Sequence, residues 1–149
     1  MPGKAVRELS AEDAAYLAGL LDGEGTIALS RRHANEHRHL VLSISSTEPE
    51  LLRWAAAATG VGKITRKRTV SERHATGLTY SVSNRQALSV LAQVAPFLRS
   101  YKRFRARLAL DKYVELTPRN GKYSHEIETL RRAFEQEFMA LTARSVARA

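Results

Sequence analysis

The pattern that most restricts the fold is a helix followed by two alternating strands, which occurs twice and is then followed by a third helix. Helices are predicted over 10–21, 51–60 and 85–98, and strands over 26–33, 39–47, 63–70 and 78–84. Strands that alternate apolar and polar side chains across short polar loops form antiparallel hairpins. The order therefore predicts an α+β fold in which a four-stranded antiparallel sheet carries its helices on one face.

Two more helices are predicted beyond this core, over 101–116 and 125–143. No linker divides the chain, and its 149 residues suit one domain. We expect a single domain over 1–149, with a core at about 10–115 and a C-terminal helical extension at 117–149.

The charge of the chain indicates a polyanionic partner. Lys plus Arg number 24 against 15 Asp plus Glu, which gives a formal net charge of +9 and a pI near 10.4. The cations gather in 61–73 and 99–107, and the acids in 8–24 and 111–137. Nucleic acid is the usual partner of such a chain. Among the cations of the second cluster, Arg103 and Arg105 are predicted to grip phosphates.

No cysteine is present, so a disulfide framework and a thiolate metal site are excluded. The first residues are charged where a signal peptide needs an apolar segment, and no apolar run is long enough for a membrane helix. We expect an intracellular protein with no membrane partner. Arginine far outnumbers lysine and alanine is abundant, which hints at GC-rich coding and a bacterial host, although an organelle is possible too.

The alternation of the strands assigns one sheet face to the core and the other to a partner. Ile27, Leu42 and Tyr80 mark the core parity of three strands, and Ile64 that of the remaining one. The opposite face is mostly hydroxyl and cationic and nearly free of acids; it comprises Thr26, Ala28, Ser30, Arg32, His39, Val41, Ser43, Ser45, Lys63, Thr65, Lys67, Thr69, Thr79, Ser81 and Ser83. Base edges and phosphates require such groups, whereas an ordinary solvated face usually mixes both charge signs. We predict that these residues bind DNA.

The end of the first helix carries the clearest chemical signal, because Leu17–Gly25 reads LAGLLDGEG. Small residues let two helix backbones approach closely. Ala15, Ala18 and Gly19 are therefore predicted to form the contact between two copies of the chain. That contact would bring together two helix ends, each with the Glu24 carboxylate and the Gly23 carbonyl oxygen. Oxygen ligands of this kind suit a hard divalent cation such as Mg²⁺.

This nonapeptide resembles the signature of the LAGLIDADG homing endonucleases, and the helices and strands around it resemble their αββαββα fold. The resemblance implies a site-specific double-strand DNA endonuclease that hydrolyses phosphodiester bonds with Mg²⁺, or with another divalent cation such as Mn²⁺ or Ca²⁺. It also implies that a chain with one motif works as a homodimer on a long pseudo-palindromic DNA target. The family usually has Asp where this chain has Glu24, so the carboxylate is retained but reaches one methylene further.

The resemblance extends to Gly60–Gly62 before the third strand and to Pro96–Leu98 before the basic helix. Relatives with the second feature place a lysine near the cleavage centre, where it stabilises phosphate charge. Lys102 is the matching residue, and a shift of the alignment would move the match to Arg99 or Arg103.

Glu48 and Asp22 are acids at helix ends with two interpretations each. Relatives often carry a polar residue at the place of Glu48 that orients active-site water, but an acid also favours the first turn of a helix. Thr47–Glu50 has the spacing of a capping box that would open that helix. Asp22 we interpret as a hydrogen-bonding residue at the helix end rather than a catalytic one.

His33, His37 and His39 gather at the first hairpin, where only Glu36 could help to complete a zinc site. We interpret them as DNA contacts or plain surface residues. Two other functions are compatible with the scaffold, namely an RNA-binding intron maturase and a DNA-binding regulator that does not cleave. A maturase would tolerate the loss of Glu24, and retention of the full motif through Glu24 argues against both alternatives, because a pure binder has no need of an acid facing phosphate.

Overall fold

The computed structural model describes residues 4–66 and 77–147. In chain order its elements are α1 (Ala11–Glu24), β1 (Gly25–Ser30), β2 (His39–Ser46), α2 (Pro49–Thr59), β3 (Lys63–Arg66), β4 (Leu78–Ser83), α3 (Asn84–Val94), the 3₁₀ helix η1 (Ala95–Phe97), α4 (Lys102–Lys112), α5 (His125–Ala140) and α6 (Ala143–Ala147). The predicted α+β class and the αββαββα order of the first seven main elements are confirmed.

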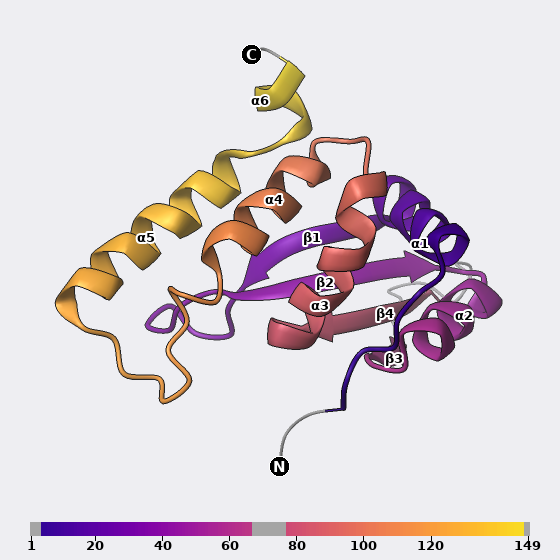
Figure 1. The fold of residues 1–149 in the computed structure, drawn as a ribbon, viewed down its shortest axis with the longest axis horizontal. Coiled ribbons are helices and arrows are strands. Elements are labelled where there is room, and N and C mark those ends of the chain that lie inside the picture. Colours follow the sequence, from indigo (N-terminus) through magenta and orange to yellow (C-terminus); the bar gives the residue numbers. More distant parts are fainter. Residues whose placement is uncertain (1–3, 67–76, 148–149) are drawn as a thin grey trace.

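The four strands form one antiparallel sheet in the order β1-β2-β4-β3. The second strand of each hairpin thus lies in the middle, and the first strands form the two edges. Helices α1, α3 and α4 lie in front of the sheet in Figure 1, while the strands form a layer behind them. The helices therefore cover one face, as the sequence predicts. No helix of the described segments is long and apolar enough to cross a membrane.

The predicted core parity holds in the three strands that the helices cover. Ile27, Leu42, Tyr80 and Val82 are each at most 3% exposed. Ile64 shares their face because it pairs with Tyr80, yet it is 36% exposed. The prediction that Ile64 is a core residue is wrong in this respect, because β3 is an edge strand beyond the cover of α1 and α3.

Helix α1 extends further than the sequence predicts. Its N-cap is Ser10, whose hydroxyl accepts from the Asp13 N–H at 3.1 Å, and its last residue is Glu24 rather than Leu21. Gly25 ends the helix in an extended conformation and opens β1 at once. A Cβ at Gly25 would lie 2.8 Å from the Leu21 Cα and 2.9 Å from the Ser43 carbonyl oxygen. Glycine is therefore required here for the close approach of helix and sheet, not for a left-handed turn.

Three later helices are shorter than predicted, among them α4, which ends at Lys112 rather than at residue 116. Pro96 interrupts the third helix, which ends at Val94 and continues as η1, because proline cannot donate to the helical ladder. The last predicted helix breaks at Leu141 into α5 and α6. Phe134 and Phe138 of α5 are buried in the same hydrophobic cluster as the strands, so the C-terminal extension packs as part of that core.

Candidate functional site

The C-terminal end of α1 presents an acid and a glycine to solvent. Gly23 and Glu24 are both exposed, and a Cβ built at Gly23 meets no atom within 4 Å. The last carbonyl groups of a helix lack intrahelical partners and need donors from elsewhere. Lys102 provides them, because its Nζ donates to the carbonyl oxygens of Leu21 at 2.7 Å and of Asp22 at 2.9 Å.

Lys102 is therefore a buried ammonium that holds the helix end next to Glu24. Lys102 is 8% exposed. Burial lowers the pKa of its ammonium below the usual value, although the nearby Asp22 and Glu24 carboxylates oppose that shift. The family resemblance implies that Lys102 meets a reacting phosphate, but two carbonyl oxygens of its own chain already accept from its ammonium. What the geometry shows is a positioning contact, and a phosphate contact stays a prediction.

Asp22 joins this helix end to the turn before α4. Its carboxylate accepts from the N–H groups of Arg99 at 2.8 Å and Ser100 at 3.1 Å, and from the Ser100 hydroxyl at 2.5 Å. Burial on its own raises the pKa of Asp22, but the hydrogen bonds from Ser100 and Arg99 and the charge of Lys102 together hold it below its ordinary value. The hydrogen-bonding interpretation of Asp22 is confirmed.

Removal of this carboxylate has a calculable effect on folding. We expect Asp22→Ala to lower the free energy of unfolding by about 2 kcal/mol at neutral pH, because two N–H groups and a hydroxyl lose an ionised acceptor. Since the folded-state pKa lies below the ordinary value of 3.8, this stabilisation is present above about pH 3.8 and is lost as the pH falls through the folded-state pKa.

Urea denaturation of the wild type and Asp22→Ala, at neutral pH and at acid pH, checks both the size and the direction of the effect. Asp111→Ala, which removes an exposed carboxylate from α4, is the control and should change the unfolding free energy by no more than about 0.5 kcal/mol. A difference for Asp22→Ala that persists unchanged into acid would contradict the assignment.

Glu48 lies just beyond β2, whose end pairs Ile44 with Gly25 at the start of β1. Glu48 is the N-cap of α2, it is exposed, and its side chain makes no capping hydrogen bond. The predicted capping box from Thr47 is wrong, because the helix opens one residue later, with Pro49 in its first turn. The position of Glu48 near the α1–β1 junction is compatible with a role for it beside Glu24.

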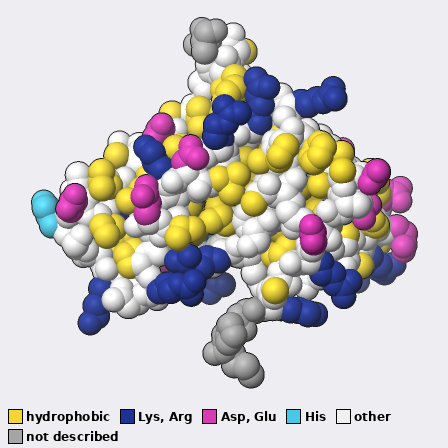
Figure 2. Space-filling view, in the orientation of Figure 1, with side chains coloured by type: hydrophobic (Ala, Val, Ile, Leu, Met, Phe, Trp, Pro, Cys, Tyr) yellow, Lys and Arg dark blue, Asp and Glu magenta, His cyan; other side chains and the backbone are white. Residues whose placement is uncertain are grey.

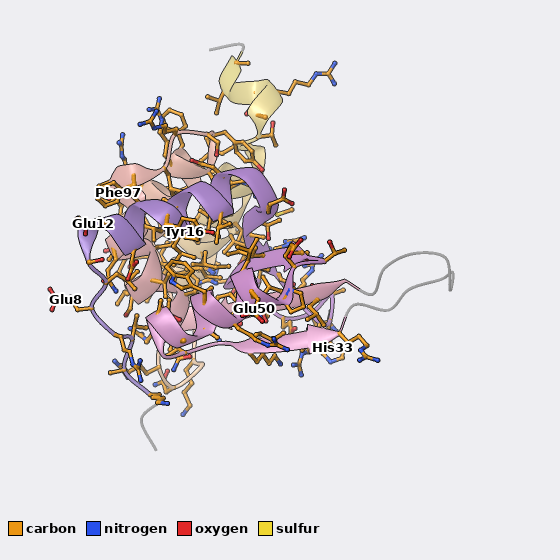
Figure 3. All side chains as sticks on the ribbon, turned by 90° about the vertical axis from the view of Figure 1, so that its right-hand side faces the viewer. Glu8, Glu12, Tyr16, His33, Glu50 and Phe97 are labelled. Atoms are coloured by element: carbon orange, nitrogen blue, oxygen red, sulfur yellow. The ribbon has the colours of Figure 1, made fainter. Side chains whose placement is uncertain are left out.

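The exposed side of α1 is the candidate contact with a second chain. Ala15 and Gly19 are exposed, and a Cβ at Gly19 meets nothing within 4 Å, so the packing of this chain does not require a glycine there. Figure 3 looks onto this side of α1, with the exposed aromatic rings of Tyr16 and Phe97 around it. Ala18 is 0% exposed in the core of its own chain, so its assignment to the contact between chains is wrong.

The sheet face opposite the helices carries ordered rows of short polar side chains. One row crosses all four strands through Thr26, Ser43, Ser81 and Lys63. The next rows are Ser45–Thr79–Thr65 on one side of it, and Ala28–Val41–Ser83 and then Ser30–His39 on the other. Hydroxyls hydrogen-bond within rows, between Thr26 and Ser43 at 2.6 Å and between Ser45 and Thr79 at 2.9 Å. Lys67 and Thr69 lie outside the described residues.

Some of the predicted DNA-binding cations are exposed, and one is hydrogen-bonded to carbonyl oxygens of its own chain. Arg32 and Lys63 are exposed at the margins of the polar sheet face. Arg105 was predicted to grip phosphate, but its guanidinium donates to the carbonyl oxygens of Leu141 at 2.7 Å and Ile27 at 2.9 Å, so that prediction is wrong. Arg103 is exposed, on the helix-covered side of the molecule. Figure 2 shows that side, where hydrophobic side chains cross the middle and Lys and Arg lie mostly toward the upper and lower edges.

The interpretation of His37 as a DNA contact or plain surface residue is also wrong. Its two ring nitrogens lie 2.7 Å from a carboxylate oxygen of Glu128 and 3.1 Å from one of Glu135. These partners are 91 and 98 residues away in the chain, so no local pattern could reveal them.

Comparisons with known proteins identify the architecture. No protein-family profile matches the chain, and no curated protein matches it in sequence. The homing endonuclease I-CvuI, solved in complex with its target in the presence of Ca, superposes with a TM-score of 0.71 at 18% identity, over 89% of this chain and 83% of that chain. The LAGLIDADG meganuclease I-AabMI, bound to uncleaved DNA, gives a TM-score of 0.61 at 20% identity, over 82% of this chain and 43% of that chain.

The chain has the LAGLIDADG homing endonuclease fold.

The archaeal intron-encoded homing endonuclease I-Vdi141I, complexed with DNA, adds a TM-score of 0.64 at 20% identity, over 88% of this chain and 84% of that chain. The LAGLIDADG fold expected from Leu17–Gly25 is thus confirmed. The I-AabMI chain is more than twice as long as the part of it that this chain matches, whereas I-CvuI and I-Vdi141I are matched over most of their length.

Proposed function

We propose that this protein is a site-specific double-strand DNA endonuclease of the homing type, which acts as a homodimer with divalent metal between its subunits. The observation that carries the proposal is the position of Glu24. Its carboxylate is exposed at the junction of α1 and β1, between the helix side that carries Ala15 and Gly19 and a sheet face of hydroxyls and cations. Such a nuclease acts inside the cell, where its DNA is.

The residues at this junction fit a hard divalent cation. Glu24 and Gly23 are exposed residues, and the carboxylate of the first and the carbonyl oxygen of the second are oxygen donors, which Mg²⁺ and Ca²⁺ prefer. Within the described residues no group of three or more His, Cys, Asp or Glu side chains comes together, so we expect a second chain and the DNA phosphates to complete the ligand set. I-CvuI has been solved with its target in 2 mM Ca and with another target in 2 mM Mg.

The second chain would dock on the exposed side of α1. Contact through Ala15 and Gly19 brings two helix backbones close, since neither side chain extends beyond a methyl group. Tyr16 at 49% and Phe97 at 38% exposure add aromatic surface on the same side. Twofold symmetry about this contact places two Glu24 carboxylates together and two sheets side by side, which suits a pseudo-palindromic target.

The sheet would then lie along the duplex. Its rows of hydroxyls can donate to or accept from base edges, and Arg32 and Lys63 at the margins can reach guanine edges or phosphates. The formal charge of +9 strengthens binding at low salt. I-CvuI and I-Vdi141I were both solved with DNA, which agrees with this use of the fold.

The chemistry assigned to the site is hydrolysis of one phosphodiester on each strand. Bound divalent metal would supply an activated water and charge stabilisation at the leaving oxygen. Glu24 and the Gly23 carbonyl oxygen would hold the ion, while Lys102 and Asp22 keep the helix end in place. Glu48, beyond the end of β2, is the candidate to orient water, while the sheet aligns the phosphate. This alignment accounts for site specificity.

Cleavage selection on a randomised double-stranded target library with Mg²⁺ tests this function. We expect cleavage of a small set of related pseudo-palindromic sequences and none after chelation of the metal. Selective binding without cleavage would indicate a regulator. Binding confined to structured RNA would indicate a maturase, and either result would overturn the proposal.

Substitutions at two neighbouring residues of β4 distinguish an effect on base preference from an effect on folding stability. The Tyr80 hydroxyl donates to the Val61 carbonyl oxygen at 2.9 Å in the core, whereas Ser81 is on the polar face. We expect Tyr80→Phe to lower the unfolding free energy by about 1–2 kcal/mol and leave base preference unchanged. Ser81→Ala is expected to change stability by less than about 0.5 kcal/mol and to alter preference at one position in each half-site.

Target profiling and thermal melting of both variants measure this contrast. If Tyr80→Phe changed base preference while Ser81→Ala did not, the DNA-facing side of the sheet would be assigned to the wrong face.

A further inference from the structure

A buried ionic cluster connects the loop between β1 and β2 to helix α5. Its centre is Arg131, which is 1% exposed. The Arg131 guanidinium donates to Glu135 at 3.0 Å, to the Leu116 carbonyl oxygen at 3.0 Å, and to the carbonyl oxygen of Arg38. Glu135 in turn accepts from the backbone N–H and the guanidinium of Arg38, both at 3.4 Å. The cluster holds the backbone of the hairpin loop at both the N–H and the carbonyl of one residue.

His37 adds a second attachment beside the first. Its Nδ1 lies 3.1 Å from Glu135 and its Nε2 lies 2.7 Å from Glu128, while its ring packs on Tyr123 with centroids 4.4 Å apart. A hydrogen bond from His37 lowers the pKa of Glu128. Burial alone raises the pKa of Glu135, but hydrogen bonds from Arg131, Arg38 and His37 hold it below its ordinary value, so both carboxyls are ionised acceptors. Only an imidazolium can donate from both nitrogens at once. Both ring nitrogens of His37 are thus directed at carboxylates of α5.

The loop that is anchored in this way also carries the exposed tip of the hairpin. Glu36 accepts from the backbone N–H groups of Arg32 and His33, which gives the tip a defined shape of its own. Figure 1 shows this loop and the α1–β1 junction at opposite ends of the sheet, with α5 next to the loop. The six residues of β1 span about 20 Å, which corresponds to about six base pairs of duplex.

From these contacts we infer that α5 is a specificity-positioning element: through His37, Arg38, Glu128 and Glu135 it fixes the hairpin tip that reads the outer end of each DNA half-site. This rests on the proposed function, because it concerns the same DNA-binding face. His37 is a positioning residue, not a base contact, since its two nitrogens are occupied by α5. A rigid tip discriminates between bases better than a mobile one. When the tip contacts an unfavourable base, a rigid loop cannot move to relieve the poor contact.

The test is a binding profile of His37→Ala on a library randomised across the whole target. We expect discrimination at the outermost positions of each half-site to fall by about tenfold and discrimination at the inner positions to stay unchanged. Glu128→Gln, which weakens one of the two contacts and leaves the buried Arg131 in place, should shift the same outer positions by a smaller factor. It also keeps the test decisive if His37→Ala does not fold.

Arg132→Ala is the matched control, because Arg132 pairs with Glu128 at 3.1 Å on the surface of α5 without touching the loop. It should leave the profile unchanged. A direct readout uses the full chain without DNA: His37→Ala should accelerate amide exchange over residues 31–38.

The inference is overturned if base preference at the outer positions is unchanged in both His37→Ala and Glu128→Gln. It is also overturned if base preference weakens equally at all positions. Unchanged amide exchange over the loop overturns it as well. If the wild-type chain shows no selective DNA binding while exchange responds as expected, the anchor exists but the proposed function fails, and with it the assignment to specificity.

Discussion

Glu24→Gln is expected to lower the rate of metal-dependent cleavage by about 10³-fold or more and to leave specific DNA binding nearly unchanged. The substitution keeps the size of the side chain but removes the negative charge that would hold a divalent cation. In the described part of the chain the Glu24 carboxylate takes part in none of the hydrogen bonds that stabilise the fold, so the melting temperature should also stay the same. Cleavage kinetics in Mg²⁺ and equilibrium binding in Ca²⁺ measure the two effects separately.

Two companion variants make this result specific. Glu12→Gln changes an exposed acid at the other end of the same helix and should retain full activity. Glu24→Asp restores the residue that is usual in the LAGLIDADG family and should cleave, at a rate that reports the effect of one methylene on metal spacing. Comparable cleavage by wild type and Glu24→Gln would remove Glu24 from the metal site.

Gly19→Leu is expected to dissociate the dimer and so to abolish cleavage, without harm to the folded chain. The effect on the monomer has the opposite sign to the effect on assembly. A side chain at Gly19 meets nothing within 4 Å in its own chain, and leucine is favoured over glycine in a helix by roughly 0.8 kcal/mol. The melting temperature of the isolated chain should therefore be unchanged or slightly higher, whereas two helices could no longer approach at this point.

Sedimentation equilibrium with and without target DNA, together with thermal melting, measures this prediction. Ala133→Leu places the same side chain at an exposed position of α5 and should preserve the dimer. A Gly19→Leu protein that remains dimeric, or a wild-type protein that binds its target as a monomer, would show that the two chains do not share a site at α1.

Local patterns in the sequence were sufficient for the sheet and its faces. The alternation in 39–47 and 78–84 places Leu42 and Tyr80 inside and Ser43 and Ser81 outside, because the period of a strand depends on the backbone alone. Ile64 shows the limit of this reasoning. Its parity is right, yet its burial depends on which strand lies at the sheet edge, and strand order is a property of the whole fold.

The motif at the end of α1 was also recognisable from local sequence, whereas the contacts around it were not. The residues Leu17–Gly25 mark the end of a helix with an acid on it, and this end is where Glu24 lies in the structure. Their pattern of small residues did not reveal that Ala18 faces the core and Gly19 the solvent, because one turn of helix presents both sides. The partners of Lys102 were equally hidden, since they come from a segment about 80 residues earlier.

By itself, the sequence determined the order of the elements, the polar face of the sheet and the acid at the end of α1, because each depends on neighbours within a few residues. Only the tertiary structure decided which charged groups are free to meet a partner. Arg105 and Lys102 are engaged by carbonyl oxygens, and His37 by two carboxylates of α5, whereas Arg32 remains exposed. A charged side chain brought near an unpaired carbonyl or carboxylate in the fold is engaged there, and that proximity is decided by the packing of distant segments.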